Sequence, residues 1–207
     1  MTALVFLDFA SVFVFALTGA LVASRAQLDP VGFAFVACLT AVGGGTLRDV
    51  LLGRDPVFWV GQPAYILVAV AAALLVFFTA HLFESRYRVL LWLDSIALSV
   101  AVAAGTGVAL DLDHSPVVVV LMGIMTGTMG GLMRDVVCNE VPLVLKQGEI
   151  YVTAAFAGAV SAVSASAIGL EGLGTLAICA AVTWFLRAGS LRFGWRLPIY
   201  KARPPKQ

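Results

Sequence analysis

A segment of this chain recurs 86 residues further on without a gap, and this repeat constrains the fold more than any other feature. The first copy contains GGGTLRD at residues 43–49, and the second contains MGGLMRD at residues 129–135. The offset is the difference between the positions of Arg48 and Arg134. It also aligns Asp8 with Asp94, Gly19 with Gly105, Pro30 with Pro116, Pro56 with Pro142, and Tyr65 with Tyr151. Chance does not align charges, prolines and glycines at one constant shift, so the chain is a tandem duplication.

The composition identifies the environment of the chain. Hydrophobic residues make up 61% of the sequence and charged residues only 12%, whereas a soluble domain is typically about 25% charged. A chain of 207 residues cannot bury this much apolar surface in water. The sequence therefore predicts an integral membrane protein, and the lack of a basic patch argues against nucleic acid as a partner.

The apolar stretches predict an all-α membrane protein with seven transmembrane helices. A helix that crosses a bilayer needs about 20 mostly apolar residues. Seven stretches meet this length: residues 3–23, 31–52, 59–82, 89–110, 117–137, 150–170 and 173–189. We expect one membrane domain over residues 1–207, with repeats at about 4–83 and 90–170, an extra helix at 173–189 and a basic cytoplasmic tail at 190–207.

Each repeat contains three predicted spans, and this odd number has a topological consequence. The second copy must enter the membrane from the side opposite to the first, which makes the unit an inverted repeat. In this architecture, substrate or ion sites lie near the midplane between the repeats. We therefore look for a functional site between the two copies.

Lysine and arginine predict the orientation, because cytoplasmic loops are enriched in them. With the C-terminus in the cytoplasm, only Arg54 among these residues falls on the opposite side. The cytoplasmic segments then hold Arg25, Arg86, Arg88, Lys146, Arg187, Arg192, Arg196, Lys201, Arg203 and Lys206. We expect the N-terminus outside and the C-terminus inside.

Glycine runs occupy the second and fifth predicted spans. They consist of Gly43, Gly44 and Gly45 in the first copy and of Gly130 and Gly131 in the second. Glycine lowers helix stability by about 1 kcal/mol relative to alanine, so each run favours a kink or a short unwound stretch. The freed carbonyls would line a water-filled path and suit a monovalent cation. The alternative is close helix packing along small-residue ridges, here Ala37, Ala41 and Gly45, and Gly123, Gly127 and Gly131.

Each glycine run is followed by an arginine and an aspartate, Arg48 with Asp49 and Arg134 with Asp135. Ionisable residues inside a membrane segment are costly and indicate function. Neighbouring residues point about 100° apart on a helix, so we expect each arginine to pair elsewhere. The predicted ion pairs are Asp8 with Arg48 and Asp94 with Arg134. Two interpretations stay open: the pairs fix the register of the helices, or they form gates or filters at either end of a pore.

These features resemble the bacterial branch of the trimeric intracellular cation (TRIC) channel family. The matching motif residues are Gly44, Gly45, Arg48, Asp49, Gly130, Gly131, Arg134 and Asp135. The second copy departs from the pattern with Met129 where the first has Gly43. The resemblance implies a homotrimer in a bacterial-type inner membrane, a pore inside each protomer, and kinked second and fifth helices. It also implies permeation of monovalent cations, chiefly potassium.

A secondary transporter for a small amino acid such as glycine is the second candidate, since some bacterial members of the family are described in this way. Inverted repeats with broken helices fit a transporter as well as a channel. An enzyme is not expected, because the sequence has no HExxH motif, phosphate-binding loop or nucleophile–histidine–acid set. We expect no metal site and no cofactor other than permeant potassium or sodium. The expected partners are further copies of the chain and membrane lipids.

Overall fold

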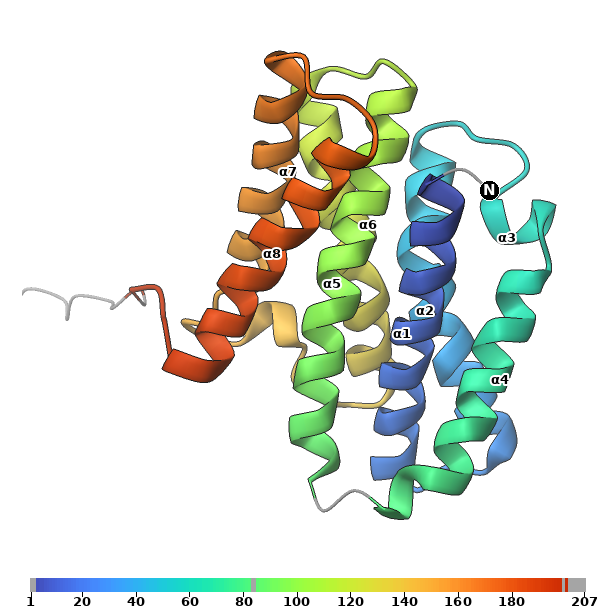
Figure 1. Cartoon of the computed structure of the whole chain (residues 1–207). Coiled ribbons are helices and arrows are strands. Elements are labelled where there is room, and N and C mark those ends of the chain that lie inside the picture. The colour runs from blue at the N-terminus through green and yellow to red at the C-terminus, as the bar shows by residue number, and fades with distance from the viewer. Residues whose placement is uncertain (1–2, 83–84, 199, 201–207) are drawn as a thin grey trace, which may run out of the picture.

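The computed structural model describes residues 3–82, 85–198 and 200, and the ordered elements in this part of the chain are helices (Figure 1). They are α1 (Ala3–Arg25), α2 (Pro30–Leu51), α3 (Phe58–Gly61), α4 (Ala64–Thr79), η1 (Ala80–Leu82), α5 (Arg86–Asp111), α6 (Pro116–Val137), η2 (Leu143–Leu145), α7 (Val152–Ala167) and α8 (Leu173–Phe193). A single antiparallel bridge joins Glu149 to Arg196 within the described residues.

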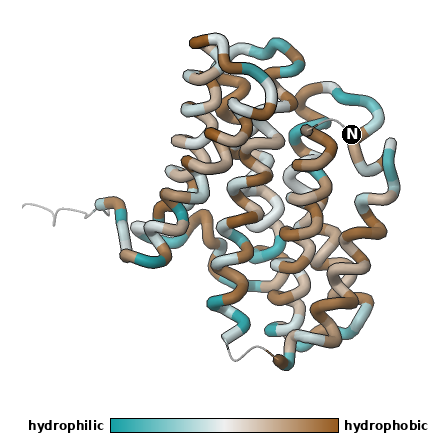
Figure 2. Tube along the Cα trace, in the orientation of Figure 1, coloured by the Kyte–Doolittle hydropathy of each residue, from teal (hydrophilic) through white to brown (hydrophobic). Residues whose placement is uncertain are grey.

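Six of the described helices are long and apolar enough to cross a membrane, which confirms the all-α membrane class. They are α1, α2, α4 together with η1, α5, α6 and α8. The remaining apolar helix, α7, has 16 residues. Large apolar side chains such as Leu67, Phe78 and Phe185 are exposed on the outer surface. Hydropathy along the trace agrees, with hydrophobic residues along the helices and hydrophilic ones concentrated in the connections (Figure 2). A lipid environment would cover these exposed side chains.

The third predicted span is the one that the structure divides. Residues 59–82 were expected to form one helix, but α3 ends at Gly61 and α4 begins at Ala64. Pro63 lies between them. Proline has no N–H to donate and disfavours helical geometry at the residue before it, here Gln62. The prediction of one continuous helix is therefore wrong at this point.

Corresponding helices of the two copies run in opposite directions. In Figure 1, α1 starts at the top of the view and α5 starts at the bottom, while α2 ends at the top and α6 ends at the bottom. Packing within the copies also corresponds. A Cβ on Gly19 would lie less than 3.0 Å from the Val36 carbonyl oxygen, and one on Gly105 equally close to that of Met122. Both pairs are related by the 86-residue offset, so each copy packs its first two helices in the same way.

The α2 and α6 helices cross in backbone contact near their centres. A Cβ on Gly44 would lie less than 3.0 Å from the carbonyl oxygen of Thr126, and one on Gly130 equally close to that of Thr40. Both helices continue through the glycine runs without interruption. The predicted unwound stretch is therefore wrong, and close packing is what the glycines provide.

The proposed small-residue ridge packs within a copy and not between copies. Cβ atoms on Gly123 and Gly127 would meet the side chains of Thr106 and Val102 on α5. Gly44 and Gly130, which lie beside the ridges, make the contact between copies. One set of small residues thus holds the second helix of each copy to the first, and another joins the two copies.

The N-terminus of α2 is capped by a side chain, which gives a stability prediction. Asp29 Oδ1 accepts a hydrogen bond from the Gly32 N–H at 2.7 Å, and Pro30 occupies the first turn. Asp29→Ala is expected to lower the free energy of unfolding by about 1 kcal/mol, the usual effect of losing an N-cap. Denaturant titration of the protein in detergent measures this. Ser115 precedes α6 but makes no side-chain cap hydrogen bond, so Ser115→Ala is the matched control. An equal loss in both variants would contradict the prediction.

Candidate functional site

A cluster of buried charges surrounds the last turn of α2, and we call it the Arg48 cluster. The Arg48 Nη1 donates to Asp8 Oδ1 at 3.0 Å, and its Nε donates to Asp49 Oδ1 at 2.8 Å. Asp49 also accepts from Arg54 Nη1 at 2.9 Å and from the Phe58 backbone N–H at 2.8 Å. The guanidinium and the Asp49 carboxylate are fully buried. The cluster thus joins α1, the end of α2 and the start of α3.

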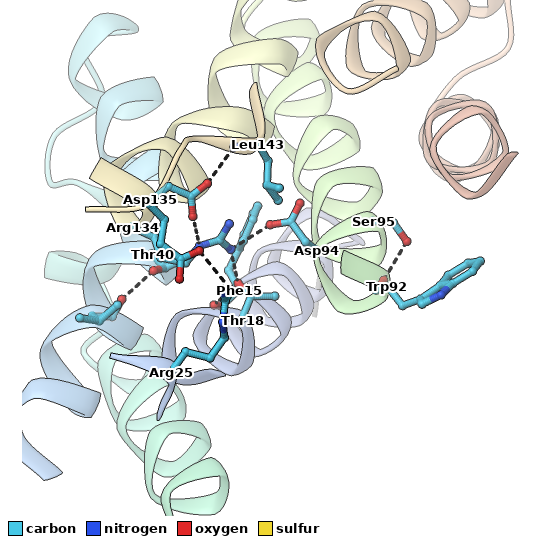
Figure 3. A network of polar contacts seen from close by, with 12 residues as sticks. Phe15, Thr18, Arg25, Thr40, Trp92, Asp94, Ser95, Arg134, Asp135 and Leu143 are labelled. Carbon is cyan, nitrogen blue, oxygen red and sulfur yellow. Dashed lines mark hydrogen bonds and ion pairs between the residues drawn. The ribbon is translucent and has the colours of Figure 1, made fainter. Parts of the chain in front are cut away.

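A second cluster, the Arg134 cluster, surrounds the last turn of α6. Figure 3 shows Arg134 between Asp94, Asp135 and Thr18. Its Nη1 donates to Asp94 Oδ1 and to the Thr18 hydroxyl, both at 2.9 Å, and its Nε donates to Asp135 Oδ1 at 2.7 Å. Asp135 Oδ2 accepts from the Leu143 backbone N–H at 2.9 Å. The bonds from Arg134 to Asp94 and Asp135 repeat those from Arg48 to Asp8 and Asp49 at the other end of the molecule, whereas the Thr18 bond and the Arg54–Asp49 pair each occur in one cluster only.

Both predicted long-range ion pairs are therefore present, but one part of the prediction is wrong. Each arginine also bonds to the aspartate that follows it in the sequence, Arg48 to Asp49 and Arg134 to Asp135. The angle of about 100° between successive residues describes where Cβ atoms point. An arginine side chain is long enough to bend around the helix, which brings its Nε beside the neighbouring carboxylate. Each guanidinium thus bridges two carboxylates.

The glycines predicted as site residues lie between the two clusters or against them. Gly44 and Gly130 form the α2–α6 crossing, while Gly43 faces the sulfur of Met133. Gly45 faces the ring of Phe58. Its counterpart Gly131 faces polar atoms of the Arg134 cluster instead. The crossing is thus flanked by one charged cluster toward each end.

Thr18 was not singled out by the sequence. Its hydroxyl connects α1 of the first copy to Arg134 of the second. The offset could not find it, because the equivalent position is Ala104, which has no hydroxyl. A threonine in an apolar helix is a weak signal on its own, since its hydroxyl usually bonds to its own backbone. Thr18 does this too, donating to the Phe15 carbonyl at 2.8 Å.

Arg187 was also missed. It was counted among the basic residues of the cytoplasmic segments, but it lies in α8 and is fully buried. Its Nη1 is 2.8 Å from Glu149 Oε2, and its guanidinium carbon is 5.0 Å from the centre of the Tyr151 ring. A signal was present in the sequence, because residue 187 falls within the last predicted span, 173–189. Arg187 therefore connects the unduplicated helix to the second copy.

The two clusters differ in their aromatic surroundings. Tyr65 stacks on Phe9 with ring centroids 4.0 Å apart and meets Phe58 edge-on at 4.8 Å. The Arg48 guanidinium carbon lies 5.4 Å from the centre of the Phe58 ring. The offset places Val144 where the first copy has Phe58. Aromatic rings therefore cover the Arg48 cluster. The second copy has no ring at the position equivalent to Phe58.

Comparison with known proteins gives matches over most of the chain. A family model described as "Glycine transporter" matches twice, at residues 5–81 and 91–167, which are again 86 residues apart. The inner membrane protein YadS of Escherichia coli is 35% identical over 201 residues, covering 94% of both chains. A membrane protein of Vibrio cholerae is 36% identical over 191 residues, covering 90% of this chain and 78% of its own length.

Solved structures extend the match to the fold. A trimeric intracellular cation channel orthologue from Rhodobacter sphaeroides is 43% identical, with a TM-score of 0.90 over 94% of this chain and 100% of that one. A prokaryotic TRIC channel is 27% identical, with a TM-score of 0.87 over 92% of this chain and 96% of that one. This chain belongs to the family that the glycine-transporter model describes and that includes the bacterial TRIC channels.

Proposed function

We propose that this protein is a channel for monovalent cations, chiefly potassium, with a path inside each protomer between the two copies. The observation that carries the proposal is the pair of buried arginine clusters at opposite ends of the α2–α6 crossing. Buried ionisable groups in a membrane protein mark ion pathways and face the interior or water. The 43% identity to a TRIC cation channel orthologue supports the same function.

The path proposed here is closed at the crossing. Gly44 against Thr126 and Gly130 against Thr40 leave no room for an added Cβ, and so none for an ion, between the two backbones. Opening would require α2 and α6 to bend or separate at the glycine runs. Carbonyl oxygens exposed there would replace part of the hydration shell of a cation. The two arginine clusters would then act as filters or gates at the two mouths.

We further propose how the protein sits in the bacterial inner membrane and assembles. Counting α7 as a seventh span makes two inverted three-helix repeats plus α8, with the N-terminus outside and the C-terminus in the cytoplasm. The distribution of lysine and arginine supports this orientation. The relative YadS is named as an inner membrane protein. A homotrimer is supported by the solved relatives, which are named as trimeric.

A transporter of glycine is the second candidate, favoured by the description of the matching family model. Arg48 and Arg134 each keep one Nη2 without a hydrogen-bond partner among the described residues, and a substrate carboxylate could accept from it. Against this, each guanidinium already touches two carboxylates. These repel an anion, so the site favours cations.

Flux into liposomes that contain the purified protein distinguishes the two functions. We expect a potassium gradient to drive a current, read as membrane potential, and a glycine gradient without permeant cation to give no uptake. Arg48→Lys and Arg134→Lys keep the charge but lose the Nε that bonds to the next aspartate, so we expect folded protein with reduced current. Arg25→Gln, which breaks a partly exposed pair with Glu140, is the control. Glycine uptake without potassium current would overturn the channel.

A further inference from the structure

The two arginine clusters differ in net charge. In the Arg48 cluster, Asp8 and Asp49 face Arg48 and Arg54, two negative charges against two positive ones. Arg54 reaches Asp49 from the loop after α2, where its backbone N–H also donates to the Asp49 carbonyl at 2.8 Å. This cluster is neutral.

The Arg134 cluster carries an excess of one negative charge. Asp94 and Asp135 share Arg134 as their ion-pair partner among the described residues. The loop after α6 has the same backbone geometry, since the Glu140 N–H donates to the Asp135 carbonyl at 2.8 Å. However, the position of Arg54 is taken here by Glu140, which pairs with Arg25 at 3.1 Å. The positive charge that neutralises the first cluster is thus absent from this loop position in the second.

Other charged groups near this cluster do not remove the excess. Arg187 lies over the Tyr151 ring, but Glu149 pairs with it at 2.8 Å, so the two cancel. Thr18 contributes a neutral hydroxyl. An uncompensated charge in a medium of low dielectric constant is costly, and proteins neutralise it or pair it. The Arg134 cluster therefore lacks a positive charge.

Polar atoms converge beside this cluster, and two of the three side chains point an unpartnered atom there. A Cβ on Gly131 would lie 3.4 Å from the Tyr151 hydroxyl, 3.6 Å from Arg134 Nη2 and 3.7 Å from Asp94 Oδ1. The Tyr151 hydroxyl, Arg134 Nη2 and Asp94 Oδ2 are buried and have no hydrogen-bond partner among the described residues. The side chains of Asp94 and Arg134 are fully buried, and Tyr151 is 2% exposed. Such groups normally have a protein or solvent partner.

The first copy closes the same place with a ring. A Cβ on Gly45 would lie less than 3.0 Å from ring carbons of Phe58, whereas the corresponding point at Gly131 faces polar atoms, first the Tyr151 hydroxyl at 3.4 Å. In the second copy the offset pairs Phe58 with Val144, and the backbone donor to the cluster aspartate is Leu143, so neither residue supplies a ring there. Missing charge, unpartnered oxygens and the missing ring thus coincide at one end of the molecule.

We propose that Asp94 Oδ2 and the Tyr151 hydroxyl bind one monovalent cation at this end of the path. The inference rests on the proposed cation channel, for which it names a binding site. Asp94 would bridge two positive partners, Arg134 through Oδ1 and the cation through Oδ2. A single positive charge balances the excess, and carboxylate and hydroxyl oxygens are ligands that hard cations prefer. A divalent ion would leave an excess positive charge in the cluster.

Thermal unfolding of the full chain in detergent tests the site. Potassium chloride replaces N-methylglucamine chloride at constant ionic strength, so only the identity of the cation changes. We expect a saturable rise in Tm of about 2–4 °C, since a ligand that binds only the folded state stabilises it. Asp94→Asn should abolish the rise, while the equivalent Asp8→Asn should keep it. Tyr151→Phe should weaken the rise more than Tyr65→Phe.

Restoring the missing charge provides a variant that does not depend on Asp94. Because the two loops correspond, Glu140→Arg should place a guanidinium on Asp135 as Arg54 is placed on Asp49. We expect this variant to unfold at a higher Tm without potassium and to lose the potassium-dependent rise. Arg25→Gln, which only frees Glu140 from its partner, should keep the rise.

Three results would overturn the site: no difference between the two cations in the unmodified protein, equal effects of Asp94→Asn and Asp8→Asn, or a full potassium-dependent rise in Glu140→Arg. A failure of the proposed channel function is distinguishable from a failure of the proposed binding site. Liposomes without potassium current but with an intact, Asp94-dependent rise in Tm would reject the channel and keep the site. Potassium current without any potassium-dependent rise in Tm would reject the binding site and keep the channel.

Discussion

Replacing Arg134 by methionine is expected to lower the free energy of unfolding by about 3–5 kcal/mol, the usual effect of removing one partner from a buried ion pair. The substitution leaves Asp94 and Asp135 buried without the guanidinium that they share. The Thr18 hydroxyl loses its donor as well. Methionine fills a similar volume, so the loss reports the charges and hydrogen bonds and not a cavity. Denaturant titration in detergent gives the value.

The control is Arg25→Met, because Arg25 pairs with Glu140 at 3.1 Å where both side chains are partly exposed. Such a pair contributes about 0.2–1 kcal/mol. Neutralising the whole cluster should restore most of the stability, so Arg134→Met combined with Asp94→Asn and Asp135→Asn is expected to be more stable than Arg134→Met alone. If the single variant and the control were equally stable, the cluster would not be energetically isolated from water as its burial indicates.

The second large effect is expected at the helix crossing. Gly44→Val would drive its Cβ into the backbone carbonyl of Thr126, which cannot move without shifting α6. Overpacking of this kind costs about 1–3 kcal/mol, and more where backbones must separate. Gly130→Val should act in the same way through Thr40. Thermal unfolding of the purified protein measures both, and the two losses should not add, because one separation of the helices relieves both clashes.

Gly43 provides the matched control for this substitution. A Cβ at Gly43 would meet the sulfur of Met133, the flexible part of a side chain that can turn aside. The second copy also has a large residue, Met129, at the equivalent position. Gly43→Val is therefore expected to cost less than Gly44→Val. Equal costs at the two positions would mean that the helices do not touch through their backbones.

The sequence was sufficient for the features that duplication makes visible. The offset related Asp8 and Arg48 to Asp94 and Arg134, and position along the predicted spans then indicated which charges could meet. Long apolar stretches identified the helices, because length and hydropathy are set by the bilayer and not by tertiary packing. The boundary errors are small except at Pro63, where a local backbone effect divided an apolar stretch.

The features that the sequence could not give depend on tertiary contacts. The bond from Arg48 to Asp49 requires a bent side chain, which a helical wheel cannot represent. Glycine propensity describes an isolated helix, and it favoured unwinding where packing of Gly44 on Thr126 keeps α2 helical. Arg187 contacts residues nearly 40 positions away, and the helix that carries it has no second copy to mark the position as special.

The central crossing also constrains how the molecule can move. Two helices that cross at one point near their middles can rotate against each other about that point while they separate there. A wider crossing angle separates both pairs of ends at once, so the two mouths of the proposed path, at the Arg48 and Arg134 clusters, would open together. A cycle in which one mouth opens while the other closes would need a rocking motion instead, with one whole repeat turning against the other. Distances measured at both mouths at the same time would therefore distinguish rotation of α2 against α6, in which both distances increase together, from rocking of one repeat, in which one increases while the other decreases.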